Sequence, residues 1–415
     1  MVQLEARRPS GDVRADVSAL SGAAGRVVGG LVVAILFMGS TLLTPLYDLY
    51  RSTYGFFTAE LVLLYAVYVI GNLAALMFFG RLSDQIGRKP MVFAGLGLAA
   101  LSTVLFLAAR DPSLLFAGRV VSGFAVGLGA GAATAWLTEF TPAAQRPRAA
   151  STMTAFNFVG LALGPLLAGE LVQYAPWPFR LPFVVYLGCL ALIAVLVAVT
   201  PESLAERSAI SLKPRLGVPA GSRMAFIAPA ATGFAAMALV GFFAALGPTT
   251  IRQDLHLGNR ALSGALVAIL FVVATGVIVA TRGVPARAAM LSGLAATPLG
   301  LALLVVAQRT ASLPVFIAGA AACGVAGAMG YRGGLAVTNS LAPPDRRAEL
   351  VSAYFVCCFM GNALPVIGAG VLAQATDAKF ADLVFAGVVS AVSAGAIVAS
   401  LAFGRPPTAA PSRPS

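Results

Sequence analysis

The sequence predicts an all-α membrane protein of twelve transmembrane helices in two six-helix bundles, and three observations support this fold class. The chain of 415 residues is 59% hydrophobic and 11% charged, whereas a soluble domain is about 45–50% apolar and about 25% charged. Its apolar runs are about 20 residues long, which lets a helix cross about 30 Å of hydrocarbon. One long polar stretch interrupts them near the middle. Backbone groups in lipid must bond internally, so unbroken runs indicate helices rather than strands.

The polar stretch at residues 201–223 is the predicted cytoplasmic linker between an N-terminal bundle (26–200) and a C-terminal bundle (224–403). Residues 1–25 and 404–415 are polar or proline-rich and are expected to be disordered cytoplasmic tails. The spans are expected at about 27–46, 59–79, 91–109, 113–137, 149–173, 181–200, 224–247, 260–281, 288–307, 313–335, 350–373 and 383–403.

The basic residues are unevenly distributed between the two sides of the predicted membrane. With the amino terminus placed inside, twenty of the 28 Lys and Arg residues fall in inside loops and tails, seven fall in outside loops, and Arg119 lies within a span. Cytoplasmic loops carry such an excess of positive charge. The distribution predicts a multi-pass protein of the cell inner membrane with both termini cytoplasmic. It also accounts for the net charge of +12 without a nucleic-acid partner.

A polar loop at residues 80–90 reads Gly80-Arg81-Leu82-Ser83-Asp84-Gln85-Ile86-Gly87-Arg88-Lys89-Pro90. The glycines allow a tight turn, and the proline suits the first turn of the following helix. This G-x-L-S-D-x-x-G-R-K-P pattern resembles the signature loop between the second and third helices of the major facilitator superfamily of secondary transporters. The resemblance covers nearly the whole chain. It implies transport by alternating access, with the substrate near the membrane midplane between the two halves.

The resemblance implies a cytoplasmic gate built from Gly80, Asp84, Gly87, Arg88, Lys89 and Glu139. Asp84 would face the amino terminus of the eleventh helix near Glu349, where free N–H groups attract a carboxylate. Arg88 would pair with Glu139 at the cytoplasmic end of the fourth helix. The alternative is that the basic residues of this loop serve only to orient the chain.

Arg119 in the fourth span is followed by Gly123 and Gly127 at four-residue spacing. Such glycines form a smooth face for close helix packing, and a charge inside a span is normally paired or faces water. The pattern R-x-x-x-G-x-x-x-G resembles the fourth-helix motif of proton-coupled members of the superfamily. An arginine does not deprotonate, so the resemblance implies that Arg119 tunes the pKa of a neighbouring acid.

Asp48, near the outer end of the first span, is the best candidate for that acid, and Glu170 and Glu60 are rivals near other outer ends. The alternative for Asp48 is an ordinary place in the outer loop beside Arg51. We expect no acid inside a span of the second half, so a carboxylate that couples protons is expected in the first half.

The fifth span contains Gly160, Gly164, Pro165 and Gly169 in the order G-x-x-x-G-P-x-x-A-G. Proline removes a backbone bond and kinks a helix, and flanking glycines let it pack. The pattern resembles the fifth-helix signature of the drug:proton antiporters of the superfamily, with Ala168 in place of one glycine. An ordinary Gly-Pro kink is the alternative. At an offset of 201 residues this span also matches the eleventh, which suggests an internal duplication.

Aromatic and polar residues within the spans are candidates for the substrate cavity: Tyr47, Tyr65, Tyr68, Asn72, Trp136 and Phe242. Packing between helices explains each of them as well as substrate contact does. Asn157 and Asn362 are further polar groups in mid-span. A cavity with few charges favours apolar or weakly cationic solutes over phosphates or dicarboxylates.

These patterns favour a proton-coupled exporter of small apolar or amphiphilic compounds, monomeric as is usual in the superfamily. The open alternatives are a proton symporter or facilitator that imports a sugar or other small metabolite, and a non-transporting membrane sensor. The four cysteines lie in apolar runs and His256 is the only histidine. With no P-loop, metal-ligand cluster or nucleophile–base pair in the sequence, we expect no enzyme, metal or cofactor.

Overall fold

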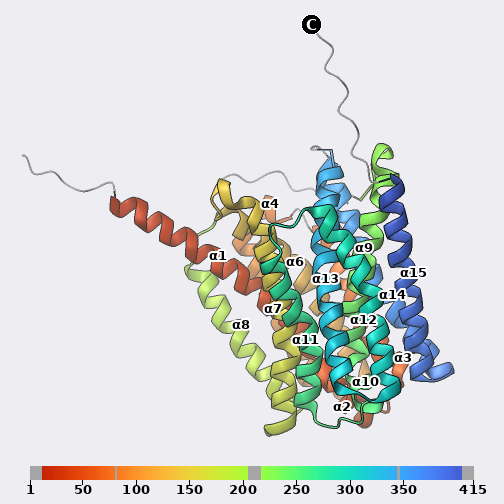
Figure 1. Cartoon of the computed structure of the whole chain (residues 1–415). Coiled ribbons are helices and arrows are strands. Elements are labelled where there is room, and N and C mark those ends of the chain that lie inside the picture. The colour runs from red at the N-terminus through yellow and green to blue at the C-terminus, as the bar shows by residue number, and fades with distance from the viewer. Residues whose placement is uncertain (1–11, 80–81, 204–215, 344–345, 404–415) are drawn as a thin grey trace, which may run out of the picture.

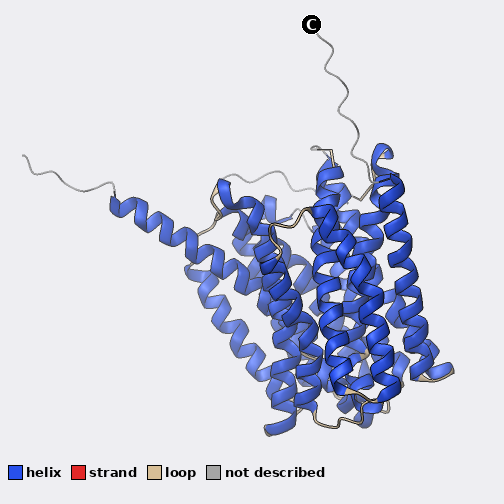
Figure 2. Ribbon diagram, in the orientation of Figure 1, coloured by secondary structure: helices blue, strands red, loops and turns tan. Residues whose placement is uncertain are grey.

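The computed structural model describes residues 12–79, 82–203, 216–343 and 346–403, apart from the side chains of Asp48 and of residues 12–21 and 146–148. Within these ranges the chain is helical, without strands (Figure 2). In the described part of the chain, twelve helices are long and apolar enough to cross a membrane, as predicted. The first of these helices begins, and the last one ends, on the same side of the molecule, which we name the terminal end. The other end is the opposite end (Figure 1).

The N-terminal bundle consists of α1 (Asp12–Thr41), α3 (Thr58–Ala74, continued by Ala75–Phe79), α5 (Arg88–Ala108), α6 (Pro112–Glu139), α7 (Arg146–Tyr174) and α8 (Leu181–Val199). The C-terminal bundle consists of α9 (Arg223–Ala245), α11 (Arg260–Ala280), α12 (Ala286–Thr310), α13 (Leu313–Leu341), α14 (Arg347–Ala375) and α15 (Ala378–Phe403). Short helices α2 (Tyr47–Tyr54), α4 (Leu82–Ile86) and α10 (Gly247–Gln253) lie between them.

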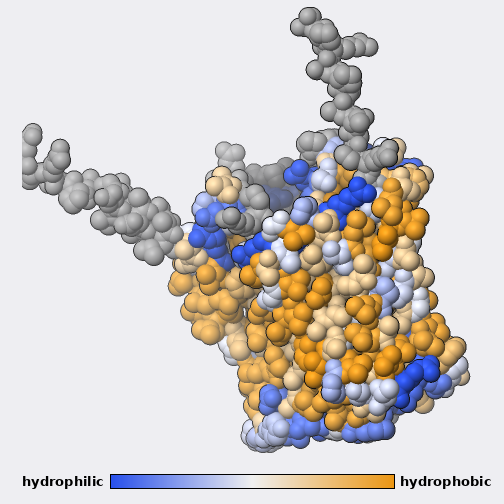
Figure 3. All heavy atoms as spheres, in the orientation of Figure 1, coloured by the Kyte–Doolittle hydropathy of each residue, from blue (hydrophilic) through white to orange (hydrophobic). Residues whose placement is uncertain are grey.

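The outer surface of the bundles is apolar around its middle and hydrophilic at both ends, as Figure 3 shows for one face. Large side chains such as Leu192, Val195 and Leu401 are more than 60% exposed there. Contiguous exposed apolar surface of this extent requires an apolar partner. The lipid bilayer supplies that partner for a belt of this kind.

Several helix boundaries differ from the expected ones by a few residues; the helix α13, for example, ends at Leu341 rather than near residue 335. The helix α1 begins at Asp12, so residues 12–25 are helical where a disordered tail was expected. This stretch is rich in alanine and contains no proline, so nothing in it stops a helix. The last helix begins at Ala378, five residues before the expected start of its span, and this brings Asp382 inside it.

Close helix contacts repeat between the two bundles. A Cβ atom at Gly160 of α7 would lie 2.2 Å from the carbonyl oxygen of Ala34 in α1, and one at Gly361 of α14 would lie 2.1 Å from that of Phe234 in α9. Only glycine allows backbones to approach this closely. The paired positions are offset by 200–201 residues, so the internal repeat of the sequence is also a repeat of helix packing.

Candidate functional site

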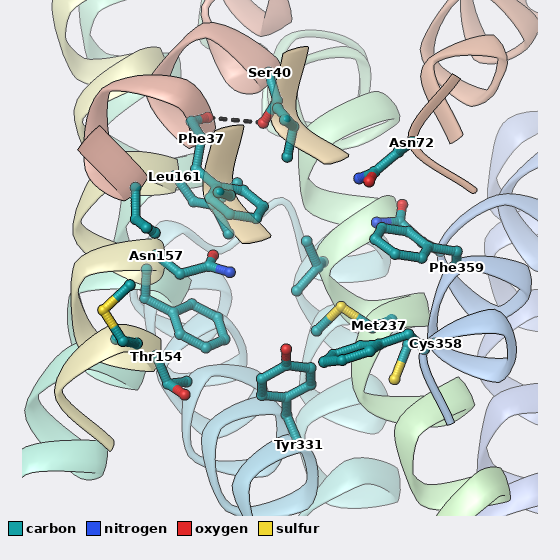
Figure 4. A pocket seen from close by; sticks show the side chains of 18 of the residues that line it. Phe37, Ser40, Asn72, Thr154, Asn157, Leu161, Met237, Tyr331, Cys358 and Phe359 are labelled. Carbon is teal, nitrogen blue, oxygen red and sulfur yellow. Dashed lines mark hydrogen bonds between the residues drawn. The ribbon is translucent and has the colours of Figure 1, made fainter. Parts of the chain in front are cut away.

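A cavity of about 300 Å³ lies between the two bundles. It is lined by residues of α1, α3, α6 and α7 of the N-terminal bundle and of α9, α13 and α14 of the C-terminal bundle (Figure 4). Ala150, Thr134, Leu335 and Phe355 place one end of the cavity near the terminal end of the molecule, because each lies within three turns of a helix end there. The cavity therefore extends from the middle of the molecule toward the terminal end.

Beyond the cavity the two bundles are in contact at the opposite end. The hydroxyl of Tyr65 donates to Oδ1 of Asn362 at 2.7 Å, directly at the cavity wall. The hydroxyl of Thr44 donates to the carbonyl of Ala244 at 3.0 Å, and the backbone N–H of Arg260 donates to the side chain of Gln173 at 2.9 Å. These bonds close the opposite end of the interface between the bundles.

The side chains expected at the cavity divide into two groups. Tyr65, Tyr68 and Asn72 of α3 line it, as do Asn157 and Asn362. Tyr47, Trp136 and Phe242 are instead buried away from its lining.

Each of the three buried aromatics has other partners. Tyr47 accepts a hydrogen bond from Arg119, and the Trp136 indole donates to the carbonyl of Pro201 at 3.2 Å. Phe242 stacks on Phe385 with ring centroids 5.0 Å apart. Hydropathy does not distinguish these residues from cavity-facing ones, because all of them lie in apolar helices.

The sequence interpretation missed several lining residues. They are large apolar or aromatic side chains from five helices: Phe37, Met153, Phe158, Met237, Tyr331, Phe355 and Phe359. Five of the seven are aromatic, and aromatic walls suit flat apolar ligands. Only the rotational position of these residues on each helix could have identified them. That position can be used only when the helices that face the other bundle are known.

Arg119 is fully buried. Its guanidinium donates to the carbonyl oxygens of Ser40 at 2.8 Å and Leu64 at 3.3 Å, and to the hydroxyl of Tyr47. It also lies 5.6–5.9 Å from the ring centroids of three tyrosines, namely Tyr47, Tyr65 and Tyr68. A buried charge is tolerated when hydrogen bonds and aromatic faces replace water. Arg119 thus ties α1, α3 and α6 together behind the cavity wall.

The acids expected to couple protons have different positions. Asp48 lies in α2, one residue after Tyr47, but its side chain is outside the described part of the structure. Glu170 is exposed on α7, and Glu60 accepts from the backbone N–H of Phe57 at 2.8 Å as part of a helix cap. Among the described side chains, neither glutamate is a hydrogen-bond partner of Arg119.

The expectation that no acid lies inside a span of the second half is wrong. Asp382 is buried in α15, where it accepts from the side chains of Gln308 and Thr250. Asp254, in the loop after α10, is also buried, and its Oδ2 has no hydrogen-bond partner among the described residues. Burial raises the pKa of the Asp254 carboxyl above its ordinary value, against the opposing charges of Lys379 and His256.

The Gly-Pro segment of α7 contacts one helix of its own bundle and one helix of the other bundle. Pro165 has no N–H, so the carbonyl of Leu161 loses its helical partner, and it accepts instead from the hydroxyl of Thr41 in α1 at 3.1 Å. A Cβ at Gly264 of α11 would lie 2.2 Å from the carbonyl of Pro165. The segment therefore belongs to the contact between the bundles at the opposite end.

The other glycines predicted for packing lie equally close to neighbouring helices. A Cβ at Gly123 would lie 2.1 Å from the carbonyl of Tyr68, and one at Gly127 would lie 2.5 Å from Ala75. One at Gly164 would meet the hydroxyl of Thr41 at 2.2 Å, and one at Gly169 would lie 2.8 Å from the carbonyl of Arg260.

The charged residues expected at the gate form a cluster at the terminal end. Arg88 is 7% exposed; it forms an ion pair with Asp84 and a second with Glu139, with an N–O distance of 2.7 Å. It also donates to the hydroxyl of Ser83 at 2.8 Å. The expected contact between Arg88 and Glu139 is thus present, and it joins α4, α5 and α6 within one bundle. The approach of Asp84 to α14 stays a prediction, and Gly80 lies outside the described residues.

Glu202 completes this cluster, and the sequence interpretation gave it no role. Its carboxylate accepts from the backbone N–H groups of Arg88 at 3.1 Å and Lys89 at 2.9 Å, so it caps the first turn of α5. Lys89 Nζ donates to the carbonyls of Ala198 and Thr200 at the end of α8. Gly87 has φ = 125°, in the region that favours glycine, which lets the chain turn into this cap.

The equivalent end of the C-terminal bundle has fewer charged contacts. Arg287 donates to the carbonyl of Ser400 at 2.8 Å, and Arg332 to that of Val284 at 3.3 Å. Arg346 pairs with Glu349 at 2.6 Å, three residues further along the chain. Among the described residues, the ion pairs that join separate helices at this end belong to the N-terminal bundle.

The chain matches a family model and curated resistance proteins. Residues 29–285 match the family model described as Major Facilitator Superfamily. The quinolone resistance protein NorA of Staphylococcus aureus is 26% identical over 167 residues, or 40% of this chain and 42% of NorA. The multidrug resistance protein MdtL of Citrobacter koseri is 27% identical over 153 residues, or 36% of this chain and 39% of MdtL. The match thus spans less than half the length of these curated relatives.

Solved structures share the fold over nearly the whole chain. A bacterial homologue of the human lysosomal transporter Spinster, in an inward-facing and unoccupied conformation, has a TM-score of 0.75 at 15% identity, covering 94% of this chain and 99% of its own. The nucleoside transporter NupG has a TM-score of 0.70 at 14% identity, covering 90% and 99%. The family model covers more than half of the chain, and the protein therefore belongs to the major facilitator superfamily of membrane transporters.

Proposed function

We propose that the protein exports small, largely apolar compounds in exchange for protons, by exposing its cavity in turn to the two sides of a cell membrane. The observation that carries this proposal is the apolar, aromatic cavity between the bundles, which is closed at the opposite end by contacts between them. A cavity between two repeats near the middle of the membrane is where such transporters bind their substrates.

The contacts at the opposite end are of a kind that a rocking motion can exchange. The bonds Tyr65–Asn362, Thr44–Ala244 and Gln173–Arg260 are single hydrogen bonds, each worth about 0.5–1.5 kcal/mol net. The ion pairs of the Arg88 cluster lie within the N-terminal bundle, so separation of the bundles at the terminal end leaves them intact. In the alternative conformation, Asp84 would meet the amino terminus of α14 and close the terminal end.

The terminal end is assigned to the cytoplasm in this proposal. Basic residues gather there, among them Arg88, Lys89, Arg223, Arg287 and Arg332, as the positive-inside rule requires of cytoplasmic loops. The cavity then faces the cell interior, where a substrate for export is loaded.

Arg119 supports the coupling to protons. Its guanidinium donates to the hydroxyl of Tyr47, and Tyr47 is the residue immediately before Asp48 in the chain. A nearby arginine favours the charged form of a carboxylate and so sets the pH at which it releases a proton. We assign the proton to Asp48 on this basis. The relatives NorA and MdtL, by their names a quinolone and a multidrug resistance protein, support the substrate class.

Reconstituted protein tests this proposal. Accumulation of a panel of lipophilic dyes added outside is measured in proteoliposomes and in empty liposomes, which contain no protein, with and without an imposed pH gradient. Exchange with protons predicts that an acidic interior drives dye accumulation beyond the empty-liposome control. A proton symporter would require an alkaline interior, a facilitator would be indifferent to the gradient, and a sensor would bind dye without flux; each of these results would reject proton-coupled export.

A further inference from the structure

The described residues of the cavity lining include no Asp, Glu, His, Lys or Arg. All 25 residues that line it are apolar, aromatic, hydroxyl, thiol or amide side chains. Transfer of an ion from water into such a site carries a large desolvation cost, which an opposite charge normally offsets. Aromatic faces attract cations, but they recover only a small part of that cost. The lining therefore favours uncharged ligands over permanent cations.

Most polar groups of the lining already have partners within the protein. The hydroxyls of Ser40, Thr134 and Thr154 each donate to a backbone carbonyl of their own helix. The hydroxyl of Tyr65 bonds to Asn362. These groups contribute little to ligand recognition, because a ligand would have to displace an existing bond.

Asn157 and Tyr331 are different. Neither the Asn157 carboxamide nor the Tyr331 hydroxyl has a hydrogen-bond partner among the described residues, and in Figure 4 both point into the cavity. Asn157 belongs to α7 of one bundle and Tyr331 to α13 of the other. The Tyr331 ring is held between Phe158 and Tyr354, with centroid distances of 6.4 and 6.2 Å, so its hydroxyl keeps a fixed direction.

We infer that the cavity binds uncharged molecules with an apolar body and one hydrogen-bonding group, which Asn157 and Tyr331 hold from opposite bundles. This inference rests on the proposed function and narrows its substrates from apolar and amphiphilic compounds to neutral ones. Asn157 offers a donor and an acceptor and Tyr331 a hydroxyl, so a carbonyl or hydroxyl of the ligand can bond to both, whereas an aromatic nitrogen, with one lone pair, accepts from one of them. A ligand held in this way contacts both halves at once.

Three probes of nearly equal shape separate charge from hydrogen bonding. They are 4-dimethylaminostilbene, 4-(4-dimethylaminostyryl)pyridine, and the N-methylpyridinium salt of the latter. The first is neutral without an acceptor on that ring, the second is neutral with a ring nitrogen as acceptor, and the third is permanently charged. Binding to the purified full-length protein is measured by probe fluorescence at about pH 8.5, where the pyridine is uncharged.

The expected order of affinity is pyridine, then stilbene, then pyridinium, with the pyridine about tenfold tighter than the pyridinium. The ring nitrogen of the pyridine accepts one hydrogen bond, so at least one of Asn157→Leu and Tyr331→Phe should weaken pyridine binding by about threefold to tenfold. Both variants should leave stilbene binding unchanged. Thr134→Val is the matched control, because the Thr134 hydroxyl lines the cavity but is already bonded to Ala130. It should bind all three probes as the wild type does.

Three results would overturn the inference. The first is a pyridinium affinity equal to or above that of the pyridine. The second is that neither the Asn157 nor the Tyr331 variant weakens pyridine binding more than stilbene binding, and the third is that no probe binds. The proposed function fails separately, because binding in the expected order without dye flux in proteoliposomes would reject transport and leave the ligand class standing.

Discussion

The two bundles share one pattern of helix packing but carry their charges differently. The close contact of Gly160 with α1 recurs as that of Gly361 with α9. Charge does not follow this repeat. The N-terminal bundle buries Arg119 and joins three helices through Arg88, whereas at an offset of 201 residues from Arg119 the C-terminal bundle has Ala320, also fully buried.

A repeat of helix packing requires small residues at equivalent positions, but it does not require equivalent charges. Small residues recur because close backbone approach has no other solution. Buried charges are costly in an apolar bundle and persist where a specific network accepts them. The N-terminal bundle buries the guanidinium of Arg119, whereas the C-terminal half buries the carboxyl groups of Asp254 and Asp382, so the buried ionisable groups of the two halves differ in kind and in position.

Removal of the buried charge of Arg119 should have the largest effect. Arg119→Gln leaves the carbonyls of Ser40 and Leu64 without their charged donor, at about 1.5–3 kcal/mol for each charged bond. Dye flux in proteoliposomes should fall by at least about tenfold. Arg309→Gln, an exposed arginine of α12, is the matched control and should retain flux. Equal losses in the two variants would contradict the asymmetry between the bundles.

The second test compares the arginines at the terminal end. Arg88→Gln removes the ion-pair partner of two carboxylates, those of Asp84 and Glu139. Both carboxylates are partly exposed, so we expect a loss of about 1–2 kcal/mol in the free energy of unfolding rather than the larger cost of a fully buried pair. Arg287→Gln, which loses one bond to a carbonyl, should stay within about 1 kcal/mol.

Thermal unfolding of the detergent-solubilised variants measures this difference. The melting temperature of Arg287→Gln should remain close to that of the wild type while that of Arg88→Gln falls. A fall of the same size in both would show that the charged cluster adds no stability beyond an ordinary hydrogen bond.

A third test concerns the bond between the bundles at the cavity wall. Tyr65→Phe removes the bond to Asn362 across the interface, and Tyr68→Phe removes a contact with Asn72 inside α3. Loss of one bond of about 1 kcal/mol should shift the population of the two conformations by about fivefold toward opening at the opposite end. Labelling rates of a cysteine placed at the closed end should rise in the first variant only. A rise of equal size in Tyr68→Phe would remove the special role of Tyr65.

The smallest expected effect is on how the melting temperature depends on pH. This dependence should have opposite signs for two loop carboxyl groups, those of Asp254 and Asp111. Burial raises the pKa of Asp254, so its charged form destabilises the fold increasingly as the pH rises from about 4 through the raised value. Asp254→Asn should therefore increase the melting temperature more at pH 8 than at pH 5.

Asp111 provides the comparison in the N-terminal bundle. Its bonds to Ser113 lower the pKa of its carboxyl, so the stability it contributes is present above pH 4 and is lost as the pH falls through the lowered value. Asp111→Ala should lower the melting temperature at pH 7, with a smaller difference at low pH. Parallel pH profiles for the two variants would contradict these assignments.

The sequence was sufficient for the number and order of the helices. Hydropathy alone predicts the twelve spans, because a polar backbone in lipid has to be helical. It misplaced the start of the last span, since Asp382 reads as a loop residue until Gln308 and Thr250, far away in the chain, are known to surround it.

The site was predicted less completely, for a physical reason. In helices that are apolar all round, the sequence does not indicate which face meets the cavity. Tyr65 and Asn72 line it, whereas Trp136 and Phe242 pack elsewhere, and Phe37 or Tyr331 could not be selected in advance. Arg88 and Glu139 were paired correctly because the loop motif supplied the partner, which hydropathy could not do.

A cross-link across the opposite end tests most directly whether the bundles must separate there for transport. Tyr174 of α7 and Asn259 before α11 are hydrogen-bonded at 3.1 Å, so cysteines at these positions can be joined by a short reducible thiol linker in a variant without the native cysteines. The pair Tyr54 and Ala109, bonded at 3.1 Å within the N-terminal bundle, is the control. We expect the first cross-link to abolish dye flux until it is reduced, while the control pair transports normally; undiminished flux with the first cross-link in place would show that the bundles need not separate at the opposite end.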